Sequence, residues 1–190
     1  MTADTHMDGS RKAGDDAAVQ ELFQTAALIL GDEEEAVVAF EKAVAGTEVD
    51  PCAEPALAYQ QARDLLTRLA VERAVALDPP AFLPESQAAT SDVCLDTDDL
   101  SATGLTPDQL KLFLSGGGRT RLRGWLEHLR PASRVVFVLR AVVGKDGSAV
   151  AEVLRSACGS SLWTAEQVGS VFRGALCSLA SSLVHAPATT

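Results

Sequence analysis

The fold is decided by residues 129–140, which read Leu-Arg-Pro-Ala-Ser-Arg-Val-Val-Phe-Val-Leu-Arg. This stretch predicts a helix over residues 131–143, and the sequence Gly-Lys-Asp-Gly at residues 144–147 predicts the turn that follows it. Convincing strand-like alternation of apolar and polar residues occurs nowhere in the chain. We therefore expect an all-α protein.

Two further helices are expected after this turn. Ser148 is expected to cap a short helix whose apolar residues include Val150. Thr164 and Gln167 have the spacing of a capping box, in which each side chain accepts a hydrogen bond from the other residue's backbone. This capping box predicts the start of the last helix, whose apolar residues continue to Leu183.

The chain before residues 129–140 also has helical periodicity. Apolar residues over 19–30 follow the spacing of an amphipathic helix, and Gly31 is expected to end it. Asp32 is expected to cap the next helix, whose acidic first turn is favoured by the helix dipole. The apolar face of that second helix is expected to consist of Ala36, Val37, Phe40 and Val44.

Prolines and caps divide the rest of the chain. A third helix is expected over residues 55–77, because Pro79 and Pro80 end its pattern. Thr106 and Gln109 form another capping box, which predicts a short helix to residue 114, and a further helix follows over residues 119–129.

These boundaries predict two small helical domains. The first covers residues 16–78 and the second covers residues 105–185. Residues 79–104 are rich in Pro, Asp, Ser and Thr and are interpreted as a linker. Residues 1–15 are polar and are interpreted as a disordered tail.

The charge of the chain is large and unevenly distributed. The 190 residues carry a formal net charge of −10, which disfavours nonspecific attraction to nucleic acid or to an anionic membrane. Acidic residues dominate residues 15–50, where Lys42 is the one basic residue, whereas arginines outnumber acids over residues 119–155. A compact arrangement with the acidic front against the basic rear is therefore possible.

Cysteine spacing and hydropathy indicate the compartment. Cys52, Cys94, Cys158 and Cys177 are widely spaced, so we expect free thiols and no zinc site. We expect no membrane span and no signal peptide, because the longest apolar run is short and the first residues are polar. A cytoplasmic protein without a metal or other cofactor is expected.

The order of these helices resembles the small extracytoplasmic-function sigma factors of the sigma-70 family, over residues 18–77 and 105–184. The rear half carries the better match, to the family's opening Leu-x-Pro-x-x-Arg-x-x-Phe-x-Leu-Arg-x-x-x-Gly. The matching residues are Leu129, Pro131, Arg134, Phe137, Leu139, Arg140 and Gly144. The resemblance implies a front domain like sigma region 2 and a helix-turn-helix domain like sigma region 4, acting with RNA polymerase core and promoter DNA.

The resemblance also implies a DNA-reading helix over residues 168–176. Arg173 is the one basic residue there, where the family usually has several. An insertion between residues 154 and 168 also makes the turn longer than usual. Since base edges are read mainly by Arg, Lys, Asn and Gln, the candidate contacts are few. The candidate DNA-binding residues are Gln167, Ser170 and Arg173 for the bases, and Arg119, Arg121 and Arg123 for the phosphates.

In the front half, residues 31–36 and 40–43 are similar to pieces of the family's polymerase-binding helix. The candidate polymerase-binding residues are Asp32, Glu35, Phe40 and Glu41. The aromatic and basic cluster with which the family opens DNA is reduced to Tyr59 and three arginines. Stacking of unpaired bases is worth about 1–3 kcal/mol per base, so one tyrosine offers little.

Two functions remain open. The first is a sigma-like transcription factor that binds polymerase and promoter DNA. The second is a degenerate sigma-like interaction protein without promoter binding, whose partner is polymerase or an anti-sigma factor. An enzyme is not expected, because Glu152, His128 and Asp146 have no partners at catalytic spacing.

Overall fold

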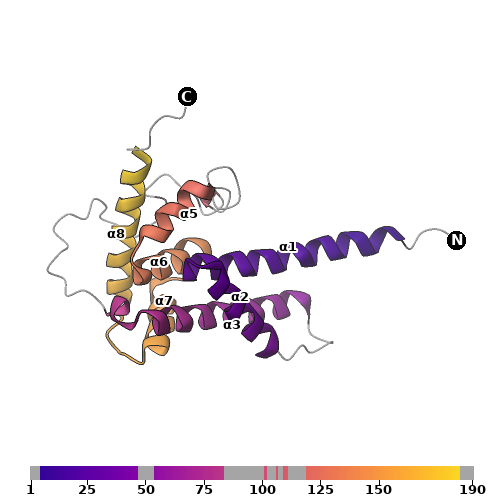
Figure 1. Ribbon diagram of the computed structural model, residues 1–190, viewed down its shortest axis with the longest axis horizontal. Coiled ribbons are helices and arrows are strands. Elements are labelled where there is room, and N and C mark those ends of the chain that lie inside the picture. Colours follow the sequence, from indigo (N-terminus) through magenta and orange to yellow (C-terminus); the bar gives the residue numbers. More distant parts are fainter. Residues whose placement is uncertain are drawn as a thin grey trace.

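The computed structural model describes residues 5–46, 54–83, 101, 106, 109–110 and 119–184. Within these residues there is no strand, so the all-α prediction is confirmed. The elements are α1 (Thr5–Leu30), α2 (Glu33–Gly46), α3 (Pro55–Leu77), η1 (Pro79–Phe82), α5 (Arg119–His128), α6 (Pro131–Phe137), η4 (Val138–Val142), α7 (Gly147–Cys158) and α8 (Ala165–Val184). Figure 1 shows α1 extending away from the other helices, with α8 at the opposite end of the molecule.

The front helices α1, α2 and α3 pack against one another, and their ends follow the local signals in the sequence. Gly31 ends α1 in the left-handed region, at φ 71°, where glycine has no Cβ penalty. Asp32 caps α2, since its Oδ1 accepts the backbone N–H of Glu34 at 2.8 Å. The helix expected over residues 55–77 is α3.

The buried face of α2 differs from the predicted one. Ala36 is buried as expected, but the other buried residues are Ala39 and Ala43. Val37 and Val44 are exposed, and Phe40 is only partly buried. The physical reason is close packing: three alanines let α2 approach α1 and α3 more nearly than larger side chains would.

The start of the chain also differs from the prediction. α1 begins at Thr5, so residues 5–15 are helical where a disordered tail was expected. The second half of α1 is fixed by buried residues such as Ile29 and Leu30. Each residue added to an existing helix gains one backbone hydrogen bond, which favours continuation of the helix toward its N-terminal end.

In the rear half, the helix predicted over residues 131–143 is α6 followed by a wide turn, η4. The backbone N–H of Val143 donates to the carbonyl oxygen of Val138 at 2.9 Å, which is the spacing of a π-turn. α7 begins at Gly147 because the carboxylate of Asp146 accepts the N–H of Ala149 at 2.8 Å. Asp146, and not Ser148, is therefore the cap of this helix.

The predicted capping boxes are confirmed. Thr164 Oγ1 accepts the N–H of Gln167 at 3.2 Å, and Gln167 Oε1 accepts the N–H of Thr164 at 2.8 Å. The same reciprocal pair joins Thr106 and Gln109, at 3.2 and 2.9 Å. Both pairs satisfy backbone donors that a helix start would otherwise leave unpaired.

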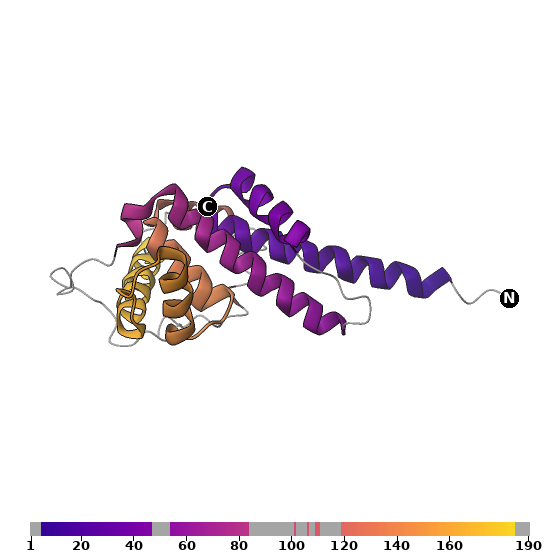
Figure 2. The same ribbon diagram turned by 90° about the horizontal axis from the view of Figure 1, so that it is seen from below.

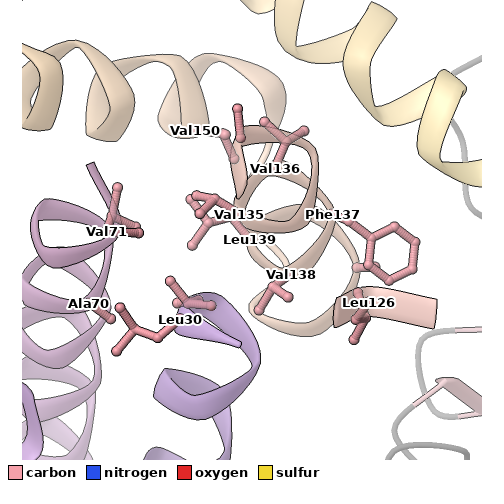
Figure 3. Close-up of a cluster of buried hydrophobic side chains, with 14 of the residues drawn as sticks. Leu30, Ala70, Val71, Leu126, Val135, Val136, Phe137, Val138, Leu139 and Val150 are labelled. Carbon is pink, nitrogen blue, oxygen red and sulfur yellow. The ribbon is translucent and has the colours of Figure 1, made fainter. Parts of the chain in front are cut away.

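One hydrophobic core runs through the front and rear helices. α3 contacts α7, and α1 contacts α6, which Figure 2 shows as rear helices gathered at one end of α1 and α3. Figure 3 shows Leu30, Ala70 and Val71 from the front helices beside Val135 and Leu139 from the rear. The two halves lie together through apolar packing, and the division into two domains stays a prediction.

The first residues of the predicted linker pack with the helices that share this core. Residues 79–82 form η1, whose Phe82 is buried. The indole Nε1 of Trp163, which is 1% exposed, donates to the carbonyl oxygen of Phe82 at 3.0 Å. Residues 79–83 are thus anchored to the rear half, and the rest of the predicted linker lies mainly outside the described residues.

Candidate nucleic-acid and protein interfaces

The candidate phosphate contacts are three arginines on α5. The side chains of Arg119 and Arg121 lie outside the described residues. Arg123 is held by two carboxylates, with Nη1 at 2.6 Å from Glu33 Oε1 and Nε at 3.1 Å from Glu127 Oε1. The hydrogen bond to Glu33 raises the pKa of Arg123. A phosphate would have to replace the contact with Glu33, which belongs to the front half.

The candidate base contacts lie near the start of α8. Gln167, Ser170 and Arg173 follow one another at intervals of three residues, so they share one side of the helix. The side-chain oxygen of Gln167 is occupied by the cap at Thr164. Arg173 is partly exposed and makes no hydrogen bond or ion pair with any described residue, so it is the one of the three with a cationic group to offer.

Arg134 and Arg140, from the stretch at residues 129–140, both bind groups within the protein. Arg134 crosses from α6 to the end of α1, where Nε donates to the carbonyl oxygen of Ile29 at 3.1 Å and Nη2 to that of Leu30 at 2.7 Å. Burial lowers the pKa of this guanidinium. Arg140 lies over the ring of Phe172, 5.2 Å from its centroid. Both arginines act within the protein.

Two more contacts join basic groups to the opposite half. Lys145 Nζ lies 2.9 Å from Asp64 Oδ1. Arg63 Nη2 donates to the carbonyl oxygen of Val143 at 2.8 Å. Together with the Arg123–Glu33 pair, these contacts place charged and polar partners of the two halves side by side, as charge complementarity suggested.

The four candidate polymerase-binding residues lie on or beside α2, but they have different surroundings. Asp32 is the helix cap. Glu35 accepts two hydrogen bonds from Arg73, at 2.6 and 2.9 Å, and this contact lowers the pKa of its carboxyl. Phe40 packs edge-on against Phe23, with ring centroids 6.4 Å apart. Glu41 is exposed.

Three valines lie on the exposed side of α2. Val37 and Val44 were predicted to be buried, and Val38 was not predicted to be part of any site. Val37, Val38 and Val44 are exposed by 44%, 54% and 60%. They lie beside the exposed carboxylates of Glu34 and Glu41. Helical periodicity predicted that Val37 and Val44 would lie on the buried face of this helix. It could not show that the smaller alanines face the core instead. We call Val37, Val38, Val44 and Glu41 the α2 face.

The cysteines differ in state. Cys158 is a free thiol, and burial raises its pKa. Cys177 is disulfide-bonded, so the expectation of free thiols is wrong for this residue. In the described parts of the chain, no group of three His, Cys, Asp or Glu side chains is placed to hold a metal ion. No helix in these parts is long and apolar enough to cross a membrane.

Comparison with known proteins does not narrow the choice of function. No protein-family model, curated protein or solved structure matches this chain.

Proposed function

We propose that this chain is a sigma-like interaction protein of transcription that binds RNA polymerase core through the α2 face and does not depend on promoter DNA. The proposal combines the sequence resemblance with the way the charged and apolar side chains are used. An anti-sigma factor is the second protein partner that the resemblance implies.

The use of basic side chains is the observation that carries the proposal. Most of the described Lys and Arg side chains bind acceptors of the same chain. These cations and their partners are Arg63 with Val143, Arg73 with Glu35, Arg123 with Glu33, Arg134 with Leu30, Lys145 with Asp64, and Arg155 with Trp163. DNA binding depends on Lys and Arg side chains that neutralise phosphates and so release the counterions condensed on the DNA, and few of the described cations remain for that role.

The α2 face supports a protein partner. Its valines bury little surface in this chain, although burial of a valine side chain contributes about 1.5–3 kcal/mol. Glu41 and Glu34 add negative charge around the apolar residues. Such a surface fits an apolar partner helix bordered by basic residues.

Binding of the purified full chain to purified polymerase core tests the proposal. Val38→Asp places a charge in the α2 face and is expected to weaken binding at least about tenfold, the effect of losing an interface hot spot. Val19→Asp is the matched control, because Val19 is also half exposed but lies on α1. Equal binding by the two variants, or no binding by the parent chain, would reject the α2 face as the polymerase site.

Promoter DNA binding is the second candidate function, and Arg173 is the observation that favours it. Its side chain is without a described partner on the predicted reading helix, next to Ser170. If DNA is bound here, affinity for a promoter-length duplex falls steeply with salt, and Arg173→Ala weakens it. Undetectable binding at low salt removes this candidate.

A further inference from the structure

A cavity of about 150 Å³ lies between α1, the start of α2 and α5, and it is partly open to solvent. Its apolar lining comes from Phe23, Ala27, Leu28 and Leu126. Its polar lining comes from Gln20, Gln24, Glu33, Arg123, Glu127 and Arg134. The cavity therefore joins an apolar wall to a group of charges, which is the usual composition of a small-molecule site.

The size of the cavity limits the ligand. An apolar protein cavity of roughly 150 Å³ can hold one benzene molecule. A ligand here has one ring or a short branched chain, which Phe23 and Leu126 would contact. A nucleotide or a sugar phosphate is too large.

The two arginines that line the cavity differ in their partners. Arg123 pairs with both Glu33 and Glu127, and these two carboxylates are about half exposed. Arg134 is more deeply placed and donates only to neutral backbone carbonyls, from Nε and Nη2. The Glu127 carboxylate lies near enough to act on Arg134 electrostatically, but among the described residues no carboxylate forms an ion pair with Arg134 at contact distance, unlike Arg123.

The third guanidinium nitrogen of Arg134, Nη1, has N–H donors that can bind a ligand. Nη1 of Arg134 makes no hydrogen bond to a described residue. It lies against Gly31, where an added Cβ would be only 2.6 Å away. Glycine at this position therefore lets the guanidinium rest on the backbone at the edge of the cavity.

We propose that this cavity binds a small monocarboxylic acid with a compact apolar body, of about the size of benzoate. The apolar body packs on Phe23, Ala27 and Leu126, and the carboxylate accepts a charge-assisted hydrogen bond from Arg134 Nη1. The ligand contacts α1 and α5 together and so binds across the two halves of the chain. This site is separate from the α2 face and does not depend on the function proposed above.

Titration of the full chain with benzoate, followed by calorimetry or ligand-observed NMR, tests the site. We expect saturable binding, and binding of benzamide that is about tenfold weaker because the amide is uncharged. Ala27→Leu fills the cavity and is expected to weaken benzoate binding at least about tenfold. Ala17→Leu is the control, since Ala17 is an exposed position on the same helix.

Folding of both variants is checked by circular dichroism. Arg134 itself is a poor first target because it also binds the end of α1, so the benzoate–benzamide comparison tests the charge without a substitution. Absence of saturable benzoate binding overturns the proposal. Equal affinity for benzamide, or binding unaffected by a folded Ala27→Leu variant, overturns it as well.

Discussion

Gly31 and Arg134 lie against each other where the front and rear halves meet. Gly31 has a φ of +71°, and the guanidinium of Arg134 occupies the place of a side chain there. Gly31→Ala is expected to lower the free energy of unfolding by about 2 kcal/mol or more, through backbone strain and displacement of Arg134. Urea denaturation measures this loss.

Gly46→Ala is the matched control for this substitution. A Cβ at Gly46 meets no atom within 4 Å, and its φ is not in the left-handed region. The variant is expected to be as stable as the parent, or slightly more stable because the unfolded chain loses freedom. Similar losses in the two variants would contradict the role given to Gly31.

Trp163 provides a second residue-level test. Its buried indole N–H satisfies the carbonyl oxygen of Phe82, so Trp163→Phe leaves a buried acceptor unpaired. We expect a loss of about 1–3 kcal/mol in the free energy of unfolding. Trp125→Phe removes a hydrogen bond to the exposed Ser178, and calorimetry should show a smaller loss than for Trp163→Phe.

At the scale of the helix, local signals in the sequence predicted most of the fold. The α3 bounds, the stop at Gly31 and both capping boxes depend on neighbouring residues, so sequence alone contains them. The outward direction of Val37 and Val44 depends on which face of α2 packs against other helices. Long-range packing of this kind leaves little trace in local periodicity.

The N-cap of α7 is a residue at which the sequence prediction, Ser148, and the structure, Asp146, differ. Asp146→Ala removes the acceptor for the N–H of Ala149 and is expected to cost about 1 kcal/mol in the free energy of unfolding. Ser148→Ala, at the exposed position predicted as the cap, is expected to change it by less than about 0.5 kcal/mol. The reverse order in a denaturation experiment would show that Ser148 is the cap.

At the scale of the molecule, the candidate site was predicted only in part. The residues that resemble the sigma family could be named from sequence, and charge complementarity suggested that front and rear lie together. The sequence could not show that Arg123 binds Glu33, or that a cavity forms beside Arg134. Both depend on where α5 lies relative to α1, which is set by packing across distant parts of the chain.

Apolar packing in the shared core holds the front and rear halves together more strongly than the ion pairs between them do. Ion pairs such as Arg123–Glu33 and Lys145–Asp64 are partly exposed and contribute about 0–1 kcal/mol each. Burial of Leu30, Val71 and Val135 contributes about 1.5–3 kcal/mol per side chain. The apolar contacts therefore dominate, and the cations of the rear half stay beside the front half at ordinary salt.

Natural probes in the two halves test this account most directly. Tyr59, the one tyrosine, lies on α3 in the front half, whereas Trp125 and Trp163 lie in the rear half. We expect tyrosine absorbance and tryptophan fluorescence to give the same urea midpoint, because one shared core unfolds as a unit. Two separate midpoints would show that front and rear fold independently, and would contradict the single body on which the proposed use of the basic side chains depends.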